Sequence, residues 1–351
     1  MKKRKIALSA VAILAVVSCG TDYRMVTTLE RNGKVHREVY DFENHRIGTG
    51  KKTMENPFLF NISDWKVTHF DDTVVSYNFF GEKREFRMKI SKDANSIEQY
   101  SQEIQCDEEN QSLAAPKESL TKKFRWFYTY YSFKTVYKKL KYEIPVSIDD
   151  YLTKEEQMLW TQGDMSKLSL MNGYETNDYL SGINDKFTEW SARNCFEIGF
   201  APIKKLTTKY DLDADKEDIY KAVRKENDGL LDITPEAICE VLDSFYETAY
   251  FSQLSGSNKK IFDEADAQFS FLNYIGNTIS YELVIPGKLL KTNAPLTHSD
   301  TLTWKVDGIR LLFEDYTLTA EYRVANIWAF ILSILMIIIA IGSVIVVVRR
   351  K

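Results

Sequence analysis

The 351-residue sequence predicts an α+β fold, in which an antiparallel β scaffold from the N- and C-terminal parts carries a helical insertion and is followed by one C-terminal transmembrane helix. Three observations support this prediction. Alternating, β-branched and aromatic segments occupy residues 23–90 and return after residue 275. Apolar residues at helical spacing fill the region between them, and an uncharged apolar run closes the chain. Sequence-distant strands on both sides of a helical region favour one scaffold with an insertion over separate domains.

The N-terminus has the features of a bacterial lipoprotein signal peptide over residues 1–18. Four basic residues at positions 2–5 precede residues 6–17, which are apolar except for one serine. As a helix this stretch would be about 18 Å long, too short for the roughly 30 Å hydrocarbon core of a bilayer. Cys19 follows between Ser18 and Gly20, and its thiol would accept the lipid after cleavage. The alternative is an ordinary secretory signal followed by a chance cysteine.

Residues 19–150 are predicted to form the β-rich first part of an extracytoplasmic domain. Asn32 and Gly33 separate two alternating segments, and this pair is typical of a two-residue hairpin because both turn positions need positive φ. Further strands are predicted at residues 65–70, 73–80 and 84–90.

Residues 124–137 form the most aromatic segment, with large rings at both alternating sets of positions. This pattern favours a strand of the sheet core, buried on one side and partly covered on the other. The alternative is a stacking platform for sugar rings or acyl chains, for which Trp126, Tyr128 and Tyr130 are the candidate ligand-binding residues.

Residues 151–275 are predicted to form the helical insertion. Thr153 and Glu156 make a capping box near its start, and Thr234 with Pro235 marks the beginning of another helix. Two apolar stripes follow helical spacing, namely Leu180, Ile183, Phe187 and Trp190, and Ile238, Val241, Leu242 and Phe245. Such stripes indicate core packing more often than ligand binding.

Residues 276–325 are predicted to be the C-terminal β part of the same domain, and residues 326–348 a transmembrane helix. The 22 residues from Ile327 carry no charge and would span about 33 Å as a helix. Trp328 is expected to anchor the outer interface, and Arg349 and Arg350, in the basic tail 349–351, the cytoplasmic one. The sequence therefore predicts a single-pass protein of the bacterial inner membrane with its domain on the extracytoplasmic side.

Charge and cysteine content narrow the possible partners. The two termini hold seven of the 46 basic residues and no acidic one, which leaves 39 basic and 50 acidic side chains and a net charge of −11 between them. This acidic middle argues against nucleic acid as a partner and against electrostatic adhesion to anionic lipid head groups. Besides Cys19 the chain has Cys106, Cys195 and Cys239, so that one disulfide or three unpaired thiols are both compatible with the sequence.

Segments at the two ends of the domain resemble the LppM-type bacterial lipoproteins. The segments are Asp22-Tyr23-Arg24-Met25-Val26 through Asn32-Gly33-Lys34-Val35, Ile285-Pro286-Gly287-Lys288, and Asp300-Thr301-Leu302-Thr303-Trp304. Those proteins are similar in plan, with a signal peptide, a lipidated cysteine, a β-rich extracytoplasmic domain and a single membrane helix. The resemblance implies a non-enzymatic envelope domain of a kind that handles lipid or glycolipid, and it carries over no binding residue.

Catalytic and metal-binding motifs are missing from the sequence. The four histidines, His36, His45, His69 and His298, show no metal-binding helical spacing, and no Gly-x-Ser-x-Gly elbow occurs. We therefore expect no catalytic residue, metal or cofactor. The favoured prediction is a membrane-anchored, non-enzymatic binding or assembly protein, whose partners are the bilayer at both ends and lipid, glycolipid or envelope proteins. The alternative is an envelope hydrolase or transferase whose carboxylates converge only in the fold.

Overall fold

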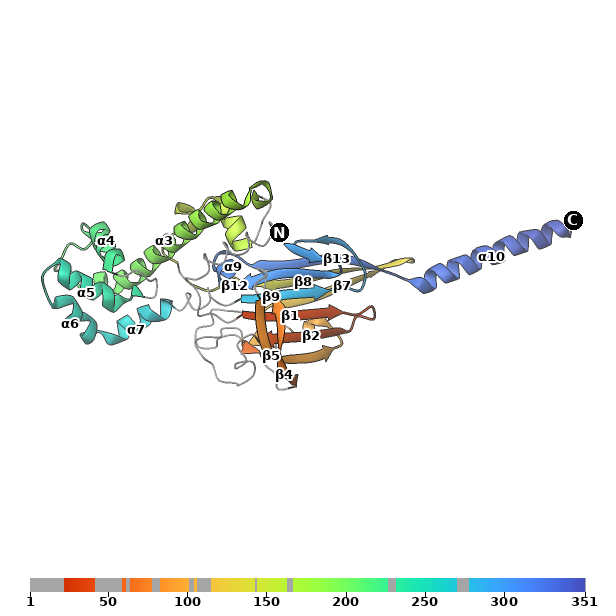
Figure 1. Cartoon of the computed structure of the whole chain (residues 1–351), viewed down its shortest axis with the longest axis horizontal. Helices are drawn as coiled ribbons and strands as arrows, with labels where there is room; N and C mark the ends of the chain where they lie inside the picture. Colours follow the sequence, from red (N-terminus) through yellow and green to blue (C-terminus); the bar gives the residue numbers. More distant parts are fainter. Residues whose placement is uncertain are drawn as a thin grey trace.

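The computed structural model describes residues 22–41, 59–60, 64–77, 83–100, 104–105, 115–142, 144–162, 167–226, 232–269 and 278–350. The predicted signal peptide, Cys19 and Cys106 lie outside these residues. Within them the chain forms a β body, with a helical part at one end and a long helix extending from the other (Figure 1).

The larger of the two main sheets, which we call the large sheet, has seven strands. In spatial order they are β11 (Leu296–His298), β12 (Thr301–Asp307), β9 (Thr278–Val284), β1 (Asp22–Leu29), β2 (Val35–Asp41), β5 (Lys83–Ala94) and β4 (Lys66–Tyr77). The ladder between β1 and β9 is parallel, with Met25 opposite Tyr281, and the other ladders are antiparallel. Because β1 and β9 come from the two ends of the β scaffold, this ladder joins them as the predicted α+β architecture requires, although it is parallel where an antiparallel scaffold was predicted.

The second main sheet, the small sheet, has four antiparallel strands. They are β10 (Lys288–Thr292), β13 (Tyr316–Ala325), β8 (Tyr128–Tyr137) and β7 (Lys117–Phe124), and a separate pair joins β3 (Leu59–Phe60) to β6 (Ile104–Gln105). The two main sheets pack face to face, since the ring of Phe133 on β8 lies 6.2 Å from that of Tyr281 and 6.3 Å from that of Trp304. Large rings therefore fill the layer between the sheets.

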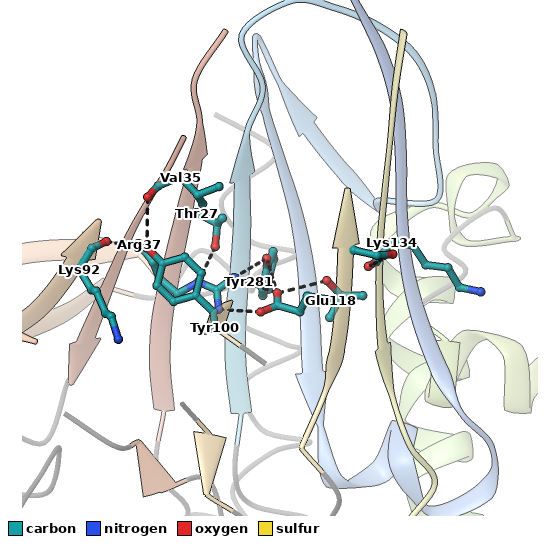
Figure 2. A network of polar contacts seen from close by, with 10 residues as sticks. Thr27, Val35, Arg37, Lys92, Tyr100, Glu118, Lys134 and Tyr281 are labelled. Atoms are coloured by element: carbon teal, nitrogen blue, oxygen red, sulfur yellow. Dashed lines mark hydrogen bonds and ion pairs between the residues drawn. The ribbon is translucent and has the colours of Figure 1, made fainter. Parts of the chain in front are cut away.

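A buried ion pair connects the two sheets (Figure 2). Arg37 on β2 donates two hydrogen bonds of 2.8 Å to Glu118 on β7, and another of 2.9 Å to Thr27 on β1. The Tyr281 hydroxyl donates to the same carboxylate at 3.2 Å, and the Tyr100 ring centroid lies 4.3 Å from the guanidinium carbon. Burial is the largest single effect and lowers the pKa of Arg37, but the charge of Glu118, the neighbouring Tyr281 and the hydrogen bond to Glu118 together raise it above its ordinary value, so that the guanidinium stays charged.

The helical part lies at the end of the body opposite to the C-terminal helix (Figure 1). Its helices are α2 (Lys154–Gln157), α3 (Gly173–Leu206), α4 (Lys216–Glu226), α5 (Pro235–Phe245), α6 (Tyr250–Ser257) and α7 (Lys259–Gln268), with the short turns η4 (Met158–Gln162) and η5 (Lys167–Leu170). Single helical turns also occur in the β body as η2 (Ile97–Tyr100), η3 (Ile148–Asp150) and α9 (Gly308–Phe313).

Local signals place these helices as predicted. Thr153 and Glu156 form the capping box at the start of α2, and Thr234 caps α5 with Pro235 in its first turn. Most members of the two predicted stripes are buried, namely Ile183, Phe187, Trp190, Ile238, Val241 and Leu242. Leu180 is half-buried, and Phe245 is 40% exposed, so the second stripe ends before the last turn of α5.

Two strand predictions differ from the structure. The segments expected at 65–70 and 73–80 belong to one strand, β4, whose register against β5 shifts between His69 and Val74, and residues 78–80 lie outside the described part. Residues 124–137 are not one strand, because a turn at 125–127 separates β7 from β8. The prediction of a strand in the sheet core is confirmed for β8, where alternate residues are buried.

Cys195 and Cys239 are buried free thiols in the helical part. Burial raises the pKa of each thiol to about 12, so both are protonated and unreactive at neutral pH. For these two cysteines the structure therefore favours unpaired thiols over a disulfide.

The C-terminal helix α10 (Ile327–Arg349) follows β13 with Asn326 alone between them. Within the described ranges it is the one helix long and apolar enough to cross a membrane, and none of its apolar window is buried. Its bounds agree with the predicted helix at 326–348 to within one residue.

Candidate membrane-interface site

The turn between β7 and β8 lies against the first turns of α10. Strands β8 and β13 are antiparallel and pair Tyr128 with Ala325, so β8 begins where β13 ends. The chain that leaves β13 therefore enters α10 beside the turn at residues 125–127. Backbone hydrogen bonds of 2.8 and 3.1 Å between Arg125 and Tyr128 close this turn. We call residues 124–128 the juxtamembrane hairpin.

The side chain of Asn326 fastens this hairpin to the start of α10. Its amide nitrogen donates to the carbonyl oxygens of Arg125 at 2.8 Å and Trp126 at 3.1 Å, and its carbonyl oxygen accepts from the Thr129 hydroxyl at 2.9 Å. The backbone N–H of Asn326 donates to the Phe127 carbonyl at 2.9 Å. One residue therefore satisfies three carbonyl groups of a turn that lies about 200 residues earlier in the sequence.

Aromatic rings from the hairpin and the helix pack against each other. Trp328 stacks on Phe124 at 6.2 Å and meets Trp126 edge-on at 5.4 Å. Phe330 contacts Phe127 at 4.8 Å, and Tyr128 at 5.8 Å. Despite these contacts Phe124, Trp126, Phe127 and Trp328 remain 41–55% exposed. Exposed aromatic rings at the end of a long apolar helix are typical of the interface between membrane and water.

A polar contact extends the hairpin further along the helix. The indole N–H of Trp126 donates to the Ser333 hydroxyl at 2.9 Å. Ser333 is one of few polar residues in α10, and this contact gives its hydroxyl a partner outside the helix. The hairpin therefore follows α10 for almost two turns rather than touching it at one point.

The three predicted ligand-binding residues lie in or directly after the juxtamembrane hairpin. Trp126 is in the turn, and Tyr128 and Tyr130 follow at the half-buried positions of β8 that alternate with its buried ones. The rings of Tyr128 and Tyr130 thus share the outer face of the small sheet, whereas the Trp126 ring contacts α10. The guanidinium carbon of Arg323 lies 4.3 Å from the Tyr128 ring centroid. Their role in binding a ligand stays a prediction.

The predicted membrane anchors lie at the two ends of α10. Trp328 is in its first turn, within the aromatic cluster, and Arg349 and Arg350 are at its last turn and C-cap. Cys19, the predicted lipidation site, lies outside the described residues.

Sequence reasoning missed two sets of residues. Asn326 and Ser333 contact a turn that is distant in sequence, so no local pattern shows their role. Arg37 carried a signal, because it occupies an inward position between Val35 and Val39 on an alternating strand. A charged residue at such a position needs a buried partner, which is Glu118.

In the parts of the chain that the structure describes, no three His, Cys, Asp or Glu side chains converge as a metal site would require. No family model matches the chain, and no curated protein matches it. Among solved structures, the folded domain of the Mycobacterium tuberculosis LppM protein, determined by NMR, matches 87% of this chain and 91% of that chain with 6% sequence identity and a TM-score of 0.26. At this score the structural resemblance is loose and supports no conclusion about fold or function.

Proposed function

We propose that the chain is a membrane-anchored envelope lipoprotein with a non-enzymatic binding or assembly role. The observation that carries this proposal is the juxtamembrane hairpin, which Asn326 and the aromatic rings hold against the first turns of α10. An apolar helix that merely ended a soluble domain would need no such belt of exposed rings where it leaves the body.

In this proposal the β body lies outside the cytoplasm of a bacterial cell. The helix α10 enters the inner membrane, the Arg349-Arg350-Lys351 tail stays on the cytoplasmic side, and a lipid on Cys19 is a second anchor. The helical part, opposite to α10 in Figure 1, is then presented away from the bilayer. Tethering confines the body near the membrane surface, so that weak contacts with lipid, glycolipid or envelope proteins suffice for binding.

Protease treatment of intact spheroplasts tests the topology. We expect the body to be digested while an epitope tag after Lys351 is protected, and both to be digested after lysis. Loss of the tag with an intact body would contradict the proposal.

Metabolic labelling with a fatty acid tests the second anchor. We expect wild-type protein to be labelled and a Cys19→Ala variant to be unlabelled while α10 keeps it in the membrane fraction. Labelling that survives in Cys19→Ala would exclude this residue as the lipidation site.

A further inference from the structure

A row of four residues crosses the outer face of the small sheet beside the juxtamembrane hairpin. Lys288 on β10 lies opposite Arg323 on β13, Arg323 opposite Tyr130 on β8, and Tyr130 opposite Lys123 on β7. Directly opposed residues on neighbouring strands point to the same face, and strands are about 4.8 Å apart. Three cations therefore lie within roughly 15 Å of one another. We call these four residues the cation row.

A fourth cation belongs to the same surface. The guanidinium carbon of Arg125, in the hairpin turn, lies 5.7 Å from the centroid of the Tyr130 ring. Arg323 lies against the ring of Tyr128 in the same way. The aromatic residues predicted to bind a ligand thus position two of the positive charges.

Among the described residues, no ion pair joins the cation row to an acidic side chain. Lys123, Arg125 and Lys288 are exposed, and none of the ion pairs found between described residues includes any of these three or Arg323. Like charges directly opposite each other on neighbouring strands, as at Lys288 and Arg323, are destabilising. An anion bound between them would remove this repulsion.

Other cations of the β body do face acids. Lys291, on the same strand as Lys288, lies opposite Glu321, and Arg24 on the large sheet makes a bidentate pair with Glu282. The cation row is therefore a local departure from a body whose net charge, between the termini, is −11.

The height of the row matches the head-group layer once α10 spans a bilayer. Tyr128 contacts Phe330 in the first turn of α10, and Tyr130 is two residues further along β8, a rise of about 7 Å. The polar layer of a bilayer is roughly 5–8 Å thick on each side. Lipid phosphates would therefore lie beside the row.

We propose that the cation row binds the phosphate groups of anionic phospholipids in the leaflet from which the body emerges. The proposal rests on the proposed function, since it requires α10 in a bilayer with the hairpin at its surface. Arg323 presents a planar set of N–H donors suited to a phosphate, and Lys123 and Lys288 flank it as point charges. The net negative charge of the domain argues against such adhesion for the molecule as a whole. It does not describe the end next to α10, where the cations of the row lie together.

Fluorescence quenching in nanodiscs tests the proposal with the full chain. The bilayer is phosphatidylcholine containing a minor, fixed fraction of lipid with brominated acyl chains, either phosphatidylglycerol or phosphatidylcholine. Trp126 and Trp328 lie at the hairpin and report bromine close to it. We expect brominated phosphatidylglycerol to be enriched around the hairpin at least about fivefold, the effect of one basic residue near an anionic surface. High salt should abolish this preference.

Matched variants locate the effect. The triple variant Lys123→Gln, Lys288→Gln and Arg323→Gln should quench equally with both brominated lipids. The double variant Lys123→Gln and Lys288→Gln changes only exposed side chains and should lose most of the preference with the fold intact. The control variant Lys117→Gln and Lys134→Gln removes two cations from the same sheet, further from the hairpin, and should behave as wild type.

The outcomes separate the two proposals. Equal quenching by both brominated lipids in wild type, or a preference that survives in the triple variant, would overturn the head-group site and favour an acidic partner protein for the row. Absence of quenching by either lipid would instead contradict the proposed function, because the hairpin would not be at the bilayer.

Discussion

The two ends of the molecule hold their positive charges in opposite ways. In the helical part Arg193 forms hydrogen bonds of 3.0 Å to Glu197 and of 2.6 and 2.9 Å to Glu217, and Lys216 lies 2.6 Å from Glu197. At the end that carries α10, Lys123, Lys288 and Arg323 have no such partner among the described residues. The contrast shows that the overall charge of a domain does not predict the chemistry of a particular surface.

The buried pair of Arg37 and Glu118 is the strongest case of charge pairing in the molecule. Breaking this pair should change the free energy of unfolding more than any other substitution considered below. Glu118→Leu leaves Arg37 buried and unpaired, so we expect a loss of about 3–5 kcal/mol in the free energy of unfolding. Adding Arg37→Met should restore much of the loss, because no unpaired charge then remains buried, although the hydroxyls of Thr27 and Tyr281 each lose a partner. Urea unfolding followed by circular dichroism measures both. A cost below about 1 kcal/mol for Glu118→Leu would show that Arg37 finds another partner.

Gly287, beside the cation row, and Gly199, in the helical part, differ in the atoms that surround them. A Cβ at Gly287 would lie 2.3 Å from the carbonyl oxygen of Arg323, whereas one at Gly199 in α3 would lie 2.7 Å from Cδ1 of Ile238. Backbone cannot move as easily as the end of a side chain, so Gly287→Ala should cost about 1–3 kcal/mol. For Gly199→Ala, the roughly 1 kcal/mol of helix propensity gained offsets the crowding.

Thermal unfolding checks the order of these two substitutions. Gly287→Ala should also weaken the preference for anionic lipid, since it displaces Arg323, and Gly199→Ala should not. Equal losses of stability in the two variants would contradict the expected rigidity around Arg323.

Two asparagines allow a matched comparison of local anchoring. Asn326→Ala removes three side-chain hydrogen bonds between hairpin and helix and should cost about 1–2 kcal/mol. Asn172→Ala removes the N-cap of α3 and should cost about 1 kcal/mol. Hydrogen exchange should accelerate at residues 125–129 in the first variant and at residues 173–175 in the second. Faster exchange at the hairpin in Asn172→Ala would show that the two ends are coupled.

The smallest effect is expected at the paired surface of the helical part. The hydrogen bond from Arg193 lowers the pKa of Glu217 below its ordinary value of 4.5. The stabilisation of the fold by this hydrogen bond is therefore present above about pH 4.5, and it is lost as the pH falls through the lower pKa that Glu217 has in the folded state. Arg193→Gln should cost less than about 1 kcal/mol at neutral pH, and the difference from wild type should vanish in acid. A difference that persists at low pH would assign the cost to packing of the Arg193 stem.

Short-range signals in the sequence predicted their elements well. The Asn32-Gly33 pair predicted the hairpin of β1 and β2 but not its loop. The last paired residues of the ladder are Leu29 and Val35, and of the two turn residues only Gly33 has a positive φ, of 93°, so the predicted two-residue turn with positive φ at both positions was wrong. The capping box at Thr153 fixed the start of α2 because both of its partners lie within one turn. The uncharged run predicted α10, since length and composition alone decide whether a helix can cross a bilayer.

Other features depended on information that a local pattern does not carry. The turn at 125–127 was missed because it contains no Gly, Pro, Asn or Asp, and rings on both sides made it look like strand. The contacts of Asn326 join segments about 200 residues apart. The cation row requires the register of four strands, so a count of charges along the chain averages it away.

The single residue between β13 and α10 has a mechanical consequence. With no flexible stalk, and with the hairpin clasping the helix on one side, the body and α10 should move as a stiff lever. Membrane helices tilt by about 20° on average and adjust that tilt to bilayer thickness. A thinner or thicker membrane would therefore swing the distant helices through an arc, converting a property of the lipid into a change of position far outside it.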